Sequence, residues 1–87
     1  MADPALEKQF HAAADAVQAL AEDPGNDVKL RLYALYKQAT VGDASGKRPG
    51  LFDPVGRAKF DAWGEAKGMT TEQAQAAYVE LVHSLPA

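Results

Sequence analysis

The segment LYALYKQATVGD, residues 32–43, carries polar groups at a spacing that brings them together on one face of a helix. With about 100° between successive helical residues, four others fall within roughly 60° of Tyr33: Lys29, Tyr36, Lys37 and Thr40. Phenol hydroxyls and ammonium groups hydrogen-bond to phosphate, and aromatic rings stack on nucleobases. This face therefore predicts contact with a ligand that carries a phosphate and a base.

An aliphatic residue, Leu30, lies beside this polar face and would suit an apolar tail. Together they indicate an amphiphilic, phosphorylated ligand. The opposite side of the same helix carries the apolar stripe expected to face the core: Val28, Leu32, Leu35 and Ala39. Taken singly, the tyrosines could instead border the core and extend their hydroxyls to water.

Further candidates lie downstream. Lys59 is a candidate second cation on the next helix, and Trp63, one turn later, is expected to pack in the core. Tyr78 lies on the apolar face of the last helix, where its hydroxyl needs a role. It is either a core tyrosine with a polar tip or a ligand contact.

Composition narrows the classes of function. A chain of 87 residues suits one domain, residues 1–87, with a surface groove in preference to a deep enclosed site. It has no cysteine, which excludes disulfides, thiolate metal sites and cysteine nucleophiles. No apolar run approaches the roughly 20 residues of a membrane span, and the N-terminus lacks a secretory signal pattern. A cytoplasmic protein is expected.

The net charge of −3 is unevenly distributed. Residues 1–28 carry one lysine and six acidic residues, residues 29–67 eight basic and four acidic, and residues 68–87 two acidic. Cations gathered in the middle of an acidic chain suit a compact anion better than a long polyanion, although a solvated charge pattern would look the same. The pI of about 5.2 argues against nucleic acid as a partner.

No catalytic constellation can be argued from the sequence. His11 and His83 lie near opposite ends, and Asp61 and Glu65, four residues apart, fit a solvated helix face better than an acid–base pair. GDASGKR, residues 42–48, has one residue too few between its glycines for a phosphate loop, an arginine where Ser or Thr belongs, and no preceding strand. We expect no enzyme activity, no metal site and no cofactor.

Two helices are predicted in the first half of the chain. The first opens at Asp3 and Pro4, a cap followed by proline, and stops at EDPGND, residues 22–27. Its apolar stripe is Leu6, Phe10, Ala13, Val17 and Leu20. The second starts near Asn26 or Asp27, either of which could cap it, and stops at Gly42.

Two more helices are predicted after a loop of about ten residues rich in Gly, Pro and Ser. The third opens at Asp53 and ends at Gly68, with Phe60 and Trp63 as its anchors. The fourth begins with TTEQ, where Thr70 and Gln73 fit a capping box. Its apolar face is Ala74, Ala77, Tyr78, Leu81, Val82 and Leu85. No strand pattern occurs, so an all-α domain is expected.

Three stretches of the chain together resemble the acyl-CoA-binding protein family: LYALYKQATVGD, RPGLFD and AKFDAWGEAKGMTTEQAQAAYVELV. The resemblance runs from about Phe10 to Leu85. It implies a four-helix bundle of up-down-down-up type that binds medium- and long-chain acyl-CoA esters one to one, without turning them over. It further implies a monomeric intracellular carrier that forms a pool of these esters and does not span a membrane.

The resemblance also implies a ligand site. The residues that match the family's binding positions are Tyr33, Tyr36 and Lys37 on the second helix, Lys59 on the third and Tyr78 on the fourth. The adenine and 3′-phosphate of CoA would meet tyrosines and lysines on the second and third helices, and the acyl chain would lie in an apolar groove. Weaker candidates are Ala14, Gln18 and Leu30.

The sequence departs from the family pattern at two positions. Phe60 stands where the family usually has tryptophan, an aromatic core element in either case. Gln18 stands where the family often has a basic residue, so one phosphate contact is expected to be weaker. The alternative to a carrier is a helical protein-interaction module, which would expose a large apolar patch.

Overall fold

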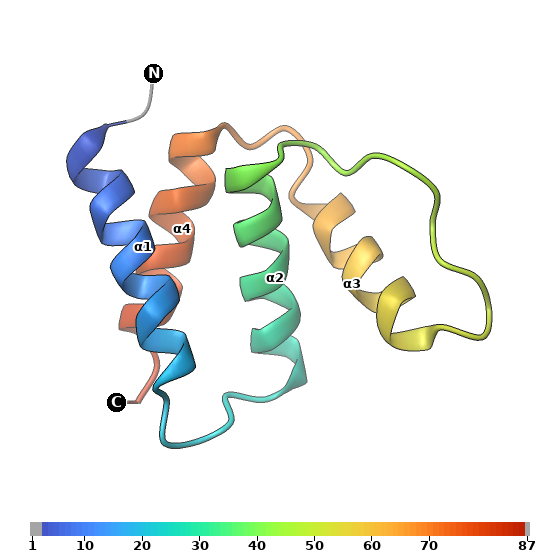
Figure 1. Ribbon diagram of the computed structural model, residues 1–87, viewed down its shortest axis with the longest axis horizontal. Helices are drawn as coiled ribbons and strands as arrows, with labels where there is room; N and C mark the ends of the chain where they lie inside the picture. Colours follow the sequence, from blue (N-terminus) through green and yellow to red (C-terminus); the bar gives the residue numbers. More distant parts are fainter. Residues whose placement is uncertain (1–2, 87) are drawn as a thin grey trace.

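The structure is a computed structural model that describes residues 3–86, which form four helices and, within that range, no strand. These helices are α1 (Pro4–Gln18), α2 (Asn26–Thr40), α3 (Pro54–Glu65) and α4 (Thr71–His83). α1 and α4 run in one direction, and α2 and α3 in the other (Figure 1). The predicted all-α, up-down-down-up fold is confirmed. Within residues 3–86, none of the helices combines the length and the apolar character that a membrane-spanning helix needs.

The helices form a flat assembly of 39 × 34 × 15 Å. α4 packs against both α1 and α2, whereas α3 packs against α2 alone, at the edge opposite α1 (Figure 1). α1 and α2 therefore both pack on α4, and they meet each other only through side chains such as Phe10 and Tyr36. As a result, α2 borders two separate spaces, one beside α3 and one toward α1.

Three of the predicted helix starts are confirmed. The Asp3 carboxylate accepts a hydrogen bond from the Ala5 N–H at 2.9 Å, and the Asp53 carboxylate accepts one from the Gly56 N–H at 2.9 Å. A Cβ at residue 56 would overlap the Asp53 carboxylate, so a larger residue there would require this capping side chain to shift. α4 starts with the predicted capping box between Thr70 and Gln73.

The predicted cap of α2 is wrong. Asn26 is already the first helical residue, and the cap position is Gly25, which makes no side-chain hydrogen bond. Gly25 has φ of +95°, a conformation that residues with a Cβ seldom adopt. Its N–H donates to the Asp23 carboxylate at 2.8 Å, so a turn, not a side-chain cap, directs the chain into the helix.

The helix ends agree in part with the prediction. Gly42, with φ of +99°, donates its N–H to the carbonyl oxygens of Lys37 and Gln38 and ends α2 as expected. α3 ends earlier than predicted, at Glu65, and Gly68 lies in the turn beyond it. α1 ends at Gln18, so the predicted stripe residue Leu20 lies outside the helix, where it is half-buried.

The main core joins α1, α2 and α4. It consists of Phe10, Ala13, Leu32, Leu35, Ala39, Ala74, Tyr78, Val79 and Val82. A second cluster of only small residues, Ala34, Ala62 and Ala66, joins α2 to α3. Small side chains allow the two helices to approach closely but bury little apolar area, so α3 is held by a modest hydrophobic contact.

Polar contacts add to the attachment of α3. The indole N–H of Trp63 donates to the Gly42 carbonyl oxygen at 2.7 Å, and the Arg48 guanidinium makes a bidentate pair with Asp61 at 2.7 and 2.8 Å. Trp63 is buried, as predicted. The expectation for Phe60 is wrong: it is half-buried and meets Trp63 edge to face without joining either core cluster.

Three hydrogen bonds fix the turn between α3 and α4 to the end of α2. The Asp43 carboxylate accepts hydrogen bonds from the Gly68 N–H at 2.9 Å and from the side-chain amide of Gln38 at 2.8 Å. The Gln38 amide also donates to the Met69 carbonyl oxygen at 3.0 Å. The bond from Gly68, and after it the bond from Gln38, lowers the pKa of Asp43, because both stabilise the carboxylate.

Candidate functional site

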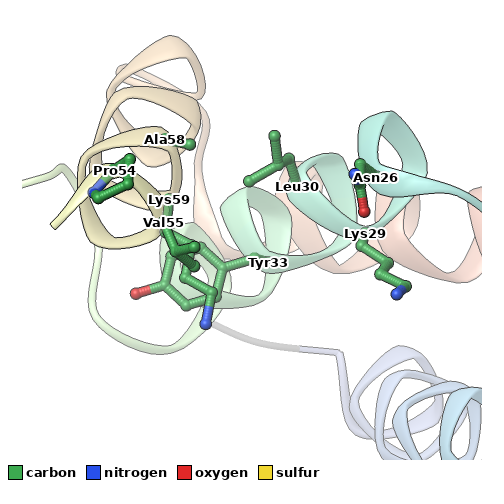
Figure 2. A pocket seen from close by; sticks show the side chains of 8 residues that line it. All are labelled: Asn26, Lys29, Leu30, Tyr33, Pro54, Val55, Ala58 and Lys59. Atoms are coloured by element: carbon green, nitrogen blue, oxygen red, sulfur yellow. The ribbon is translucent and has the colours of Figure 1, made fainter.

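A groove of about 350 Å³ lies between α2 and α3 and is lined mainly by apolar groups. We call it the apolar groove. Its lining residues are Asn26, Lys29, Leu30 and Tyr33 from α2, and Pro54, Val55, Ala58 and Lys59 from α3 (Figure 2). It exists because the two helices touch through alanines at one end and leave the first turns of each apart.

A cation lies over the aromatic ring at this groove. The Lys59 ammonium lies 5.5 Å from the centre of the Tyr33 ring, close enough for a cation–π interaction (Figure 2). Lys29 extends away from that ring and pairs with Asp23 at 2.6 Å. Of the two lysines that line the groove, Lys59 is therefore the one positioned to meet an anion beside Tyr33.

A second hollow, of about 380 Å³, lies where α1 and α2 both rest on α4. We call it the aromatic pocket. Its lining residues are Ala14, Asp15, Gln18, Leu32, Tyr33, Tyr36 and Tyr78. The lining has three phenol groups and one carboxylate but no basic side chain, so it favours a flat, uncharged group over a phosphate.

Ring contacts hold the aromatic pocket in shape. Tyr36 stacks against Phe10 with ring centres 5.5 Å apart, and Tyr78 meets Phe10 edge to face at 5.0 Å. Burial, and to a smaller extent Tyr36, raises the pKa of the Tyr78 phenol. Tyr78 is therefore a neutral phenol with a proton to donate, and within residues 3–86 its hydroxyl makes no hydrogen bond.

Tyr33 is the residue shared by both spaces, because it lines the apolar groove and the aromatic pocket. An elongated molecule could therefore lie with an apolar end in the groove and a flat aromatic end in the pocket. Its middle would pass Tyr33 and the Lys59 ammonium. Such an arrangement suits an amphiphilic, phosphorylated ligand.

The structure brings together seven of the eight predicted site residues. Leu30, Tyr33 and Lys59 line the apolar groove; Ala14, Gln18, Tyr33, Tyr36 and Tyr78 line the aromatic pocket. Lys37 lines neither, since its ammonium lies 4.9 Å from the centre of the Trp63 ring. Thr40, also on the predicted polar face, donates its hydroxyl to the Tyr36 carbonyl oxygen at 2.8 Å and so is engaged within α2.

Sequence reasoning missed part of the groove. Pro54, Val55 and Ala58 line it from α3, and Asp15 lines the aromatic pocket from α1. The helical period offered a signal, because Pro54 and Ala58, like Val55 and Lys59, lie four residues apart on one side of a helix.

Comparison of this sequence with models of known protein families shows which family it belongs to. A model of the family described as "Acyl CoA binding protein" matches residues 7–82. The chain belongs to the acyl-CoA-binding protein family. The resemblance stated from the sequence is thereby confirmed.

Members of this family share most of the chain's length and its fold. Acyl-CoA-binding protein homolog 1 of Caenorhabditis elegans is 51% identical over 76 residues, which cover 87% of this chain and 88% of that protein. The crystal structure of Oryza sativa Acyl-CoA-Binding Protein 2 superposes with a TM-score of 0.88 at 41% identity, covering 92% of this chain and 89% of that one.

The chain also resembles part of a larger enzyme. Enoyl-CoA delta isomerase 2 of Rattus norvegicus is 51% identical over 81 residues, which are 93% of this chain but only 21% of that protein. The chain thus spans about a fifth of this relative and matches it over an acyl-CoA-binding domain, so the similarity carries no isomerase activity to this chain.

Proposed function

We propose that this chain binds medium- and long-chain fatty acyl-CoA esters and carries them without altering the thioester. Membership of the acyl-CoA-binding protein family gives the ligand class. One observation supports the assignment of the ligand's parts to the two spaces. Tyr33 lies between the apolar groove and the aromatic pocket, and the Lys59 ammonium lies against its ring. The acyl chain then lies in the groove and the adenine in the pocket.

The apolar groove suits the acyl chain. Leu30, Val55 and Ala58 offer aliphatic surface, and the volume of about 350 Å³ accommodates a substantial part of a fatty chain. Each methylene that enters contributes about 0.8 kcal/mol. Affinity should therefore rise with chain length until the groove is full.

The aromatic pocket suits the adenine. Tyr36 offers an aromatic face that is partly exposed, and the hydroxyl of Tyr78 can donate to a ring nitrogen. Asp15 at the same pocket would repel a phosphate held there. The 3′-phosphate is therefore placed at the boundary of the two spaces, where Tyr33 offers a hydroxyl and Lys59 a positive charge.

Lys37 joins this site by leaving Trp63. It lies on the same face of α2 as Tyr33 and Tyr36, and its long side chain can rotate from the indole toward the boundary. Gln18 at the rim of the aromatic pocket can offer a neutral hydrogen bond to the ligand. Two ammonium groups would then flank the 3′-phosphate, from α2 and from α3.

Binding without catalysis fits the lining of both spaces. Among the described residues that form them, there is one carboxylate, Asp15, and no histidine, so no pair of side chains is placed to activate water on a thioester. We propose a monomeric, cytoplasmic carrier that uses no cofactor and binds no nucleic acid. The acidic pI of about 5.2 supports the last point.

Parallel calorimetric titrations with a C16 acyl-CoA, free CoA and the free fatty acid test the proposal. The whole ester should bind one to one and more tightly than either half. Equal affinity for free CoA and the ester would refute the use of the apolar groove. Release of free CoA during a long incubation, followed with a thiol reagent, would refute the non-catalytic role.

A further inference from the structure

Three large apolar side chains project into solvent where the α2–α3 loop enters α3. Phe52 is fully exposed, Leu51 is 78% exposed and Val55 is 64% exposed. We call these three residues the apolar apex. Neither core cluster includes any of them. Exposing this much apolar surface on adjacent residues is unfavourable in water, so its position calls for a partner.

The apex lies within the most basic part of the chain. Residues 44–59 carry four basic residues and one acidic residue, whereas the rest of the chain carries five basic and eleven acidic residues. Of these four, Arg48 pairs with Asp61 and Lys59 lies over the Tyr33 ring, so Lys47 and Arg57 remain as the positive charges of this segment. Lys47 is exposed and forms no ion pair with the described residues. The partner that complements this surface is apolar inside and anionic at its rim.

The apex is continuous with the apolar groove. Val55 belongs to both, and its neighbours Pro54 and Lys59 also line the groove (Figure 2). α3 lies at an edge of the flat molecule, packed on α2 alone, so this edge can approach an extended surface without obstruction by α1 or α4 (Figure 1).

We propose that the apolar apex docks on an anionic lipid surface, with Leu51 and Phe52 entering the interface and Lys47 meeting lipid phosphates. The proposal rests on the assignment of the acyl chain to the apolar groove. In the docked state a fatty chain passes between the bilayer and the groove along Val55, with less exposure to water than a route through solution.

A lipid surface fits the apex better than a folded protein does. A stable protein interface takes about 800 Å² from each partner, far more than three side chains on a narrow edge supply. A bilayer, in contrast, accepts a few inserted apolar groups, and adds the attraction of anionic headgroups for nearby cations. The mixed character of the apex, apolar at its tip and basic beside it, matches both requirements.

Flotation of the purified full chain with lipid vesicles tests the proposal. Vesicles of phosphatidylcholine alone are compared with vesicles that also contain phosphatidylserine, at low and at physiological ionic strength. The wild-type chain should float with the anionic vesicles, and less so as salt rises, because salt screens the charges. Failure of the wild-type chain to associate with anionic vesicles at low salt overturns the proposal.

Single substitutions with matched controls test which residues contribute to vesicle association. Phe52→Ser and Leu51→Ser should each lower association by about tenfold, since each removes one inserted apolar side chain. Val41→Ser is the control, because Val41 is also exposed but lies at the other end of the α2–α3 loop. Lys47→Glu should weaken association with anionic vesicles only, whereas Arg31→Glu, on α2 and in neither ligand space, should have little effect.

Solution binding separates this proposal from the ligand assignment. Phe52→Ser should bind a short-chain acyl-CoA in buffer with wild-type affinity, yet extract a long-chain ester from anionic vesicles more slowly. Loss of ligand affinity in buffer would place the apex in the ligand site and overturn docking. If the wild type forms a concentration-dependent dimer that Phe52→Ser abolishes, the apolar apex serves self-association instead. If Phe52→Ser floats with anionic vesicles as well as the wild type does, the apolar apex has no part in docking.

Discussion

Lys37→Ala offers the sharpest test of how the polar end of the ligand is held. A charge-assisted hydrogen bond to the 3′-phosphate contributes about 1.5–3 kcal/mol. To make it, Lys37 must leave the Trp63 ring, where its ammonium lies 4.9 Å from the centre. That cation–π contact contributes about 0.5–1 kcal/mol at a partly exposed position.

The difference between these two contributions sets the expected effect. Lys37→Ala should weaken acyl-CoA binding by about 1–2 kcal/mol, or about five- to thirtyfold. It should also lower the melting temperature by about 2–8 °C, because the contact with Trp63 is lost in the free protein. Isothermal titration calorimetry and thermal unfolding of the same preparations measure both quantities.

An acyl-dephospho-CoA, which lacks the 3′-phosphate, makes the test decisive. The wild-type chain should bind it more weakly than acyl-CoA, and Lys37→Ala should lose little further affinity for it. Arg31→Ala is the control, because it removes a positive charge from another face of α2 and lines neither ligand space. If Lys37→Ala weakens both ligands equally, Lys37 does not contact the 3′-phosphate and the boundary is assigned wrongly.

Three further outcomes follow from the contacts described above. Ala58→Phe should fill the apolar groove and weaken a C16 ester by about tenfold in calorimetry while leaving free CoA unaffected, and equal loss for both would contradict the tail assignment. Ligand binding should change the fluorescence of Trp63, because Lys37 leaves its ring, and Lys37→Ala should show a smaller change. Asp43→Asn should lower the melting temperature at neutral pH, because the depressed pKa of Asp43 marks stability that is present above the unfolded-state pKa. As pH falls from about 6 to about 2, protonation of Asp43 in the wild type should remove this difference in melting temperature. A difference that stays constant across that range would refute a stabilising role for the hydrogen bonds that Asp43 accepts.

Much of this fold can be read from the sequence because helix boundaries depend on nearby residues. Asp3, Asp53 and the Thr70 box each satisfy N–H groups within three residues of themselves, so their positions alone indicate where helices begin. The exception is Gly25, which acts through a positive φ that no pattern of side-chain acceptors reveals. The polar face of α2 could be predicted from the sequence for the same reason, because all of its residues lie on one helix.

The tertiary structure decided what depends on contacts between helices. No local signal states that α3 packs on α2 alone, and it is this packing that forms the apolar groove with Val55 and Ala58 in its lining. Lys37 shares a helix face with Tyr33, but Trp63 from α3 draws its ammonium away from both ligand spaces. The face on which a residue lies is fixed by the regular hydrogen-bonded geometry of its own helix, within a few residues. The partner that a side chain meets is fixed by segments some 20 or more residues away, brought near only when the core closes.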